Sequence, residues 1–163
     1  MVSHVNGLRW RLRCGLGLAV LFLAGLTLQA AEPARVLFVT QSKGFRHGSV
    51  NRRANQLAPA EIAMTQLGQQ TKLFTIDCTQ DCQADFTAAN LQKYQIVMFY
   101  TTGVLPITDK DRDYFVNKWR KTKGHGYMGF HSATDTYRTK NPGHKWYQEI
   151  AGATFSGHPW GAG

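Results

Sequence analysis

The chain has 163 residues, of which 43% are hydrophobic, and a formal net charge of +9. This length provides one domain with a single core and is too short for two once a leader is set aside. The densest cluster of positive charge lies at the end of a predicted helix and comprises Lys118, Arg120, Lys121 and Lys123. Basic residues in a last helical turn complement the helix dipole, and no nucleic-acid-binding motif is present, so we expect no nucleic-acid partner.

The first 31 residues have the pattern of a secretory signal peptide. Three arginines stand at positions 9 to 13, residues 15–28 form an apolar run, and small residues follow as a cleavage site. The run is short for a membrane-spanning helix, so an uncleaved anchor is the less favoured alternative. We expect a periplasmic or secreted protein without membrane association beyond export. Removing residues 1–31 with their three arginines leaves residues 32–163, which number 132 and carry +6.

The predicted mature part begins with a buried strand. Residues 35–40 are β-branched and aromatic, and residues 41–49 contain two glycines without apolar periodicity, which predicts a loop. A helix is expected to begin within residues 58–61, because proline and glutamate are favourable in a first turn. Its predicted core face comprises Ile62, Ala63, Met64 and Leu67. Gly68 is its predicted end.

Strands and helices continue to alternate along the rest of the chain. Residues 72–77, 95–100 and 126–130 are the predicted second, third and fourth strands. Thr108 is the expected N-cap of the helix between the third and fourth strands, and residues 145–152 form a short helix closed by glycine. This alternation predicts an α/β fold with a parallel sheet flanked by helices.

Two cysteines remain in the predicted mature part. Cys78 and Cys82 are four residues apart, and in an oxidising compartment such spacing favours a small local disulfide. Two free thiols are the second interpretation. Half of a metal site is the third, because no partner pair of cysteines exists.

Polar residues follow the first and fourth predicted strands. Arg46 and His47 come after the first strand, His131 and Ser132 come directly after the fourth, and Asp135 follows one turn later. The carboxyl ends of parallel strands meet at one edge of a sheet, where ligands bind in open α/β folds. The alternatives are that His131 only caps its strand and that the residues of the first loop have no task.

Four motifs in order resemble the trehalose-utilisation (ThuA-like) family. They occupy residues 44–47 (Gly-Phe-Arg-His), 100–103 (Tyr-Thr-Thr-Gly), 129–136 (Gly-Phe-His-Ser-Ala-Thr-Asp-Thr) and 157–160 (Gly-His-Pro-Trp). The resemblance implies a flavodoxin-like fold similar to class I glutamine amidotransferases and a role in carbohydrate utilisation. It also implies a chain that continues through further strands, so residues 32–163 are expected to be the N-terminal part of such a domain, incomplete at its C-terminal end.

The amidotransferase comparison excludes one chemistry. The nucleophile of that superfamily is the cysteine of a Gly-x-Cys-x-Gly elbow, and His131 stands at the matching position here. Cys78 and Cys82 lie in a different loop of the prediction. We therefore do not expect a glutamine amidotransferase, because hydrolysis of glutamine by that route needs the thiolate.

Histidines and a carboxylate at one edge suit acid–base chemistry or a divalent metal such as zinc, and the sequence leaves both open because no zinc-binding motif is present. The predicted catalytic residues are His131 as base, Asp135 orienting it, and His47. The predicted substrate-binding residues are Arg46, Tyr100, Thr102, Ser132 and His158. Two function classes follow for a small-molecule sugar ligand: a sugar-acting enzyme, or a non-catalytic carbohydrate-binding or interaction module.

Overall fold

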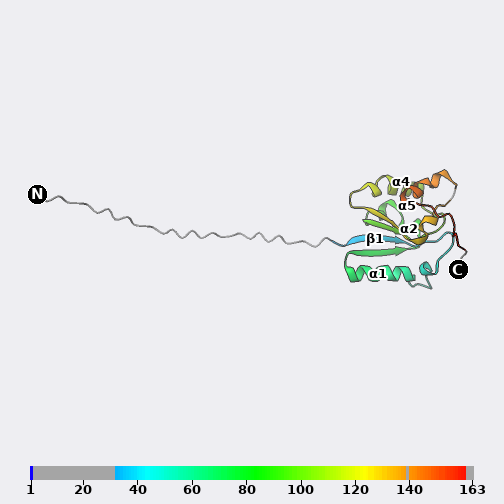
Figure 1. Ribbon diagram of the computed structural model, residues 1–163, viewed down its shortest axis with the longest axis horizontal. Coiled ribbons are helices and arrows are strands. Elements are labelled where there is room, and N and C mark those ends of the chain that lie inside the picture. The colour runs from blue at the N-terminus through cyan, green and yellow to red at the C-terminus, as the bar shows by residue number, and fades with distance from the viewer. Residues whose placement is uncertain (2–31, 139, 161–163) are drawn as a thin grey trace. The chain divides into compact units, whose positions relative to one another are not determined.

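The computed structural model describes residue 1 and residues 32–138 and 140–160; residues 2–31 of the predicted signal peptide lie outside the described part. Four parallel strands form one sheet: β1 (Ala34–Val39), β2 (Phe74–Thr79), β3 (Ile96–Phe99) and β4 (Gly126–Gly129). Their order is β2-β1-β3-β4 (Figure 1). This is the order in which a flavodoxin-like sheet places its first four strands.

Helices lie on both faces of this sheet. They are α1 (Pro59–Thr71), α2 (Cys82–Asp85), α3 (Ala88–Leu91), α4 (Asp109–Asn117) and α5 (Lys145–Ala151), with 3-10 turns at Gly48–Val50, Trp119–Lys121, His131–Asp135 and Pro142–His144. Figure 1 shows α1 on one side of the sheet and α4 and α5 on the other. The predicted α/β fold is confirmed. Within the described ranges, no helix has the length and apolarity needed to cross a membrane.

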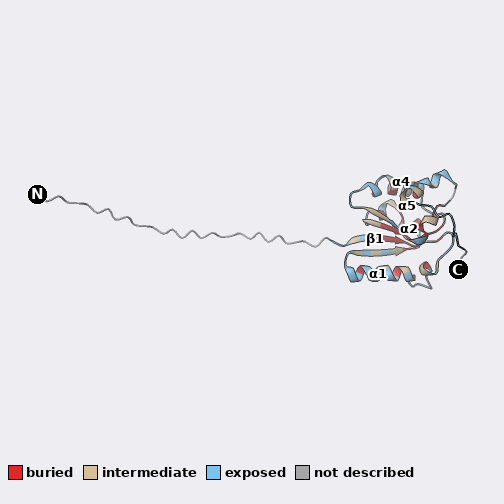
Figure 2. Ribbon diagram, viewed as in Figure 1, coloured by how far each residue is buried: buried red, intermediate tan, exposed pale blue. Residues whose placement is uncertain are grey.

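The sheet separates two apolar clusters. On the face of α4 and α5, Leu37 and Phe99 meet Phe115, Trp119 and Tyr147, all of them buried. On the face of α1, a smaller cluster is built on Val36, Phe38 and Met98. The alternation along β1 explains this division, because successive side chains of a strand point to opposite faces. Figure 2 shows the buried residues concentrated in the central strands.

The predicted start of the helix between the third and fourth strands is confirmed, and the helix predicted to begin within residues 58–61 begins at Pro59. Thr108 accepts a hydrogen bond from the backbone N–H of Asp111 and opens α4. Gly152 closes α5 with a φ of 71°, a left-handed conformation that favours glycine.

The predicted core face of α1 is wrong in part. Ile62 and Leu67 are 43% and 44% exposed and Ala63 is also exposed, whereas Glu61 and Gly68 are buried and Met64 contacts the core. The helix has therefore turned a glycine and a glutamate toward the sheet.

Gly68 does not end the helix, which continues to Thr71. A Cβ at Gly68 would lie 2.8 Å from the carbonyl oxygen of Phe74, so glycine permits the close approach of α1 to β2. Lys72 is the residue that ends the helix, with a φ of 56°, and β2 begins at Phe74, two residues later than predicted.

Glu61 is completely buried in a hydrogen-bonded network. The Arg52 guanidinium donates from Nε to Oε2 and from Nη2 to Oε1, each at 2.8 Å, while Thr40 and the backbone N–H of Ala58 also donate to the carboxylate. Burial raises the pKa of Glu61, but the bonds from Arg52 and Thr40 outweigh it and hold the pKa below its ordinary value. The buried carboxylate is thus ionised and paired.

Cys78 and Cys82 are both free, so the predicted local disulfide is wrong. Cys78 is on β2 and packs with the cluster under α1, whereas Cys82 opens α2 and belongs to the cluster on the other face. Burial raises the pKa of Cys78 to about 11 and that of Cys82 to about 12. Both thiols are therefore protonated and poor nucleophiles at neutral pH.

Candidate functional site

The turn after β4 has the geometry of a nucleophile elbow. His131 follows Phe130, opens the 3-10 turn His131–Asp135 and has a φ of 44°. A non-glycine residue in this region costs about 1–3 kcal/mol, and such residues cluster at active sites, although Lys72 at the end of α1 is in the same region. The hydroxyl of Tyr147 donates to the carbonyl of Ala133 at 2.9 Å and supports the turn from the core side. The strand-to-helix turn therefore presents His131 at the carboxyl end of the sheet.

The loop after β3 holds the loop after β1. Thr102 is buried, and its hydroxyl accepts from the backbone N–H of Gly44 at 3.3 Å and donates to the carbonyl of Phe45 at 2.8 Å. Gly103 has a φ of 73°, and a Cβ there would lie 2.5 Å from the carbonyl carbon of Lys43. These contacts fix the backbone from which His47 projects.

Replacing Gly103 by alanine is expected to lower the free energy of unfolding by more than about 1 kcal/mol, because both the left-handed φ and the contact with Lys43 oppose a Cβ. Gly124 is the matched control: its φ is 87°, but a Cβ there meets nothing within 4 Å. Urea unfolding of both alanine variants measures the difference. A Gly103 variant no less stable than the Gly124 variant would contradict the close approach of the two loops.

Aromatic rings surround the two histidines. The ring centroids of His47 and His131 are 4.5 Å apart, and the ring of Tyr100 stacks on His131 at 5.5 Å with an interplanar angle of 28°. Phe45 meets the edge of His47 at 4.9 Å. The hydroxyl of Tyr100 is 2.8 Å from that of Ser49, which fixes the ring beneath His131.

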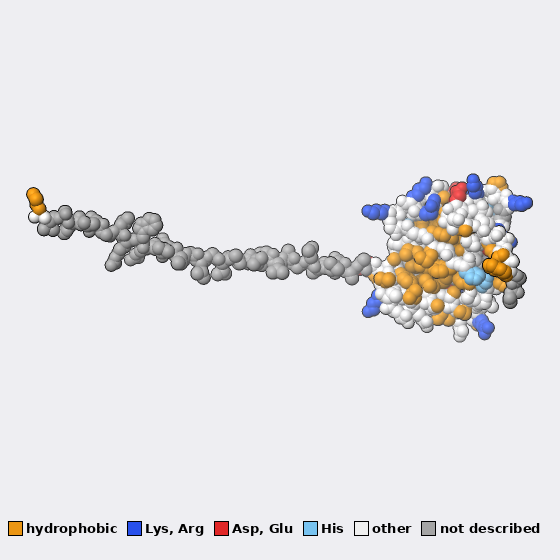
Figure 3. Space-filling view, viewed as in Figure 1, with side chains coloured by type: hydrophobic (Ala, Val, Ile, Leu, Met, Phe, Trp, Pro, Cys, Tyr) orange, Lys and Arg blue, Asp and Glu red, His pale blue; other side chains and the backbone are white. Residues whose placement is uncertain are grey.

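A cavity of about 490 Å³ opens at this cluster, a volume in the range of small-molecule sites. It is lined by Phe45, His47, His131, Ser132, Thr134, Asp135, Phe155 and His158. Figure 3 shows a histidine side chain beside hydrophobic side chains on one face of the domain, with lysines and arginines scattered around it. No cysteine is among these lining residues.

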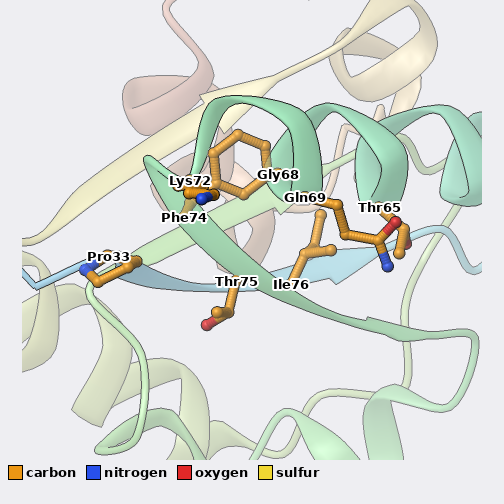
Figure 4. A pocket seen from close by; sticks show the side chains of 8 residues that line it. All are labelled: Pro33, Thr65, Gly68, Gln69, Lys72, Phe74, Thr75 and Ile76. Carbon is orange, nitrogen blue, oxygen red and sulfur yellow. The ribbon is translucent and has the colours of Figure 1, made fainter.

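A second cavity, of about 460 Å³, lies between α1 and β2 (Figure 4). Its lining residues are Pro33, Thr65, Gly68, Gln69, Lys72, Phe74, Thr75 and Ile76. Lys72 is the single titratable residue of this lining, so the cavity offers no acid–base pair. The first cavity is therefore the candidate site.

Asp135 is paired with Arg138 and does not orient His131 as predicted. Its Oδ1 lies 3.0 Å from Nε of Arg138, and the part of the chain that the structure describes contains no hydrogen bond between Asp135 and His131. Arg138 also donates to the carbonyl of Phe155 at 3.3 Å, and its guanidinium carbon is 5.1 Å from the centroid of that ring. The backbone N–H of Phe155 donates to the carbonyl of Thr134 at 3.0 Å. Arg138 thus anchors the segment that carries Phe155 and His158.

The charge of His47 is set by its neighbours. Burial lowers the pKa of His47, and the nearby His131 and His158 lower it further, while Asp135 acts in the opposite direction. The net effect is a pKa below the ordinary 6.5, so His47 is neutral at pH 7. A neutral imidazole can accept a proton or a hydrogen bond.

The structure brings together five of the predicted site residues: His47, His131, Ser132, Asp135 and His158 all line the cavity. Tyr100 lies against His131 without lining it.

Two other predicted residues lie elsewhere. Arg46 is exposed and outside the lining, and Thr102 is engaged in holding the loop after β1. Thr134, Phe155 and Arg138 were not among the predicted site residues. Thr134 and Phe155 stand in or beside the quoted motifs, but the role of Arg138 depends on contacts that no pattern encodes. No group of three or more metal-ligating side chains among the described residues is arranged to hold an ion.

One family model and one solved structure match the chain. A family model described as "ThuA: Trehalose utilisation" matches residues 35–162. A ThuA-like protein from Bacteroides uniformis, whose crystal structure is known, is 24% identical, with a TM-score of 0.48, over 77% of this chain and 46% of its own. The chain thus spans less than half the length of that protein. No curated protein matches the sequence.

Proposed function

Because the chain belongs to the trehalose utilisation (ThuA) family, we propose that it takes part in carbohydrate utilisation by binding a sugar in the cavity at the carboxyl end of the sheet. One observation carries this proposal: the cavity combines exposed aromatic walls with two histidines whose rings are 4.5 Å apart. Sugars present apolar C–H faces to aromatic rings and hydroxyl groups to polar side chains, so both kinds of wall have a partner on the same ligand.

Phe45 lines the solvent-exposed side of the cavity. It is 70% exposed beside the cavity, and Phe155 lines the cavity as well. A large apolar side chain in this position gains free energy when a ligand covers it. Two aromatic residues in one lining therefore favour a ring-shaped ligand with an apolar face.

The chemistry open to this site is acid–base catalysis by the two histidines. His131 is the proposed base, and the neutral His47 is the proposed second proton carrier. Two imidazoles this close disfavour a second proton on the pair, so one can hold a proton while the other accepts one. We further propose that the domain acts after export, in the periplasm or outside the cell.

A non-catalytic carbohydrate-binding module is the second candidate, and one observation favours it. A catalytic base is usually oriented by a third group, yet Asp135 is held by Arg138 and no hydrogen bond to either histidine ring occurs within residues 32–138 and 140–160. Binding without chemistry requires no such orientation.

The proposed function is tested by titration calorimetry of the full chain with trehalose and with methyl α-D-glucopyranoside. We expect saturable binding, weakened by about tenfold in Phe45→Ala, since about 1.4 kcal/mol corresponds to that factor. Leu73 is the matched control, because it is 72% exposed and outside this lining. Leu73→Ala should bind as the wild type does. Absence of binding to both sugars would overturn the proposal.

A further inference from the structure

Two buried polar atoms in the cavity lining have no partner in the structure. Among the described residues, Nδ1 of His47 and Oγ of Ser132 are buried and make no hydrogen bond, and both residues line the same cavity. A buried donor or acceptor that stays unpaired costs about 1–3 kcal/mol, and such groups in native proteins call for a partner. No described residue supplies that partner, and a bound ligand can.

The charges of the lining restrict what that partner can be. Asp135 is the one carboxylate in the lining, and the lining contains no lysine or arginine. Arg138 is engaged with Asp135 and the carbonyl of Phe155. His47 is neutral at pH 7 because burial and the neighbouring His131 lower its pKa. The lining therefore offers no lysine or arginine side chain to pair with an anionic group.

The hydrogen-bonding character of Nδ1 of His47 and Oγ of Ser132 further restricts which ligand group can be their partner. A serine hydroxyl donates and accepts, and Nδ1 of a neutral imidazole does one or the other according to its tautomer. A ligand hydroxyl satisfies both atoms in either tautomer, because it also donates and accepts. The aromatic rings of Phe45 and Phe155 bind an apolar face but do not distinguish one hydroxyl group of the ligand from another.

We propose that Ser132 and His47 select the sugar, each pairing with a hydroxyl group of a neutral ligand, and that Ser132 is a specificity-determining residue. This inference rests on the proposed sugar binding and names what the site recognises. A sugar that lacks the recognised hydroxyl leaves a buried group unpaired, which is how polar sites reject deoxy analogues. Sugar acids are disfavoured because no lysine or arginine lines the cavity.

The test uses calorimetric titration of the full chain with methyl α-D-glucopyranoside, its monodeoxy analogues, gluconate and inorganic phosphate. We expect at least one deoxy analogue to bind the wild type tenfold or more weakly than the parent, and gluconate and phosphate to bind more weakly still. Ser132→Ala should bind the parent about tenfold more weakly and should no longer distinguish that analogue, because the unpaired group has been removed. Ser156→Ala, an exposed serine outside the lining, should discriminate as the wild type does.

The outcomes separate the two proposals. If the parent glucoside binds but all deoxy analogues bind equally, or if Ser132→Ala keeps its discrimination while thermal unfolding shows it folded, the inference is overturned and sugar binding stands. Tighter binding of gluconate or phosphate than of the glucoside overturns the neutral-ligand argument. If neither the glucosides nor trehalose binds the wild type, the proposed function falls and this inference with it.

Discussion

Replacing Arg52 by methionine is expected to lower the free energy of unfolding by about 3–5 kcal/mol at pH 7, the cost of leaving a buried charge without its partner. Glu61 is completely buried and receives two hydrogen bonds of 2.8 Å from the Arg52 guanidinium. Thr40 and the N–H of Ala58 remain in the variant, but neither neutralises the carboxylate. Urea unfolding measures the loss, and Arg53→Met, at an exposed neighbouring arginine, is the matched control.

The pH dependence of this variant gives a second check. In the wild type the pKa of Glu61 is lowered from 4.5, so its contribution to stability is present above that value and is lost as the pH falls through the lower, folded-state pKa. In Arg52→Met, burial acts without the main opposing bonds and favours the protonated carboxyl. The difference in the free energy of unfolding between the wild type and Arg52→Met should therefore become smaller in acid. An equal loss of unfolding free energy at pH 7 and pH 4 would show that Arg52 acts through its apolar contacts instead.

Patterns in the sequence predicted the sheet because its two central strands are apolar enough to be recognised alone. Residues 35–40 and 95–100 became the central strands β1 and β3 within a residue or two. The family proposed from four motifs is confirmed by a match over residues 35–162. The positions of these strands and the order of the motifs depend only on residues close together in the sequence, so they can be predicted from it.

Predictions failed where burial depended on tertiary contacts. Hydrophobic periodicity placed Ile62 and Leu67 in the core, yet α1 buries Gly68 for its close approach to β2 and Glu61 for its pairing with Arg52. No single-residue scale anticipates a buried glutamate, because its partner lies in another segment.

The candidate site was predictable in its location but not in its side-chain pairing. Parallel topology alone placed His47 and His131 at one edge, and their rings are 4.5 Å apart. The partner of Asp135 was not predictable, since spacing along the chain cannot decide between a histidine four residues before it and Arg138 three residues after it. Side-chain partners at this edge are decided by the paths of the loops.

If the site is catalytic, His131→Ala is expected to lower turnover of trehalose or a glucoside by about 10²–10⁴-fold while the sugar still binds, because general acid–base catalysis contributes that much. His131→Asn is the sharper variant, since asparagine tolerates the φ of 44° better than alanine does and still lacks an imidazole. Sugar consumption followed by NMR measures turnover, and calorimetry measures binding. His125, whose ring nitrogen lies 2.9 Å from the carbonyl of Trp119 at the opposite end of β4, supplies the control variant His125→Ala.

The pH profile tests the role of His47 in the same assay. Burial and the neighbouring His131 lower its pKa below 6.5, so a reaction that needs the neutral ring should rise with pH and reach its plateau before the ordinary histidine value. Replacing His47 by asparagine should remove this rising limb. Turnover that is unchanged in both His131 variants would exclude the catalytic assignment. Sugar binding without any turnover by the wild type would leave the carbohydrate-binding module, because the same pair of histidines can bind a sugar without transferring a proton.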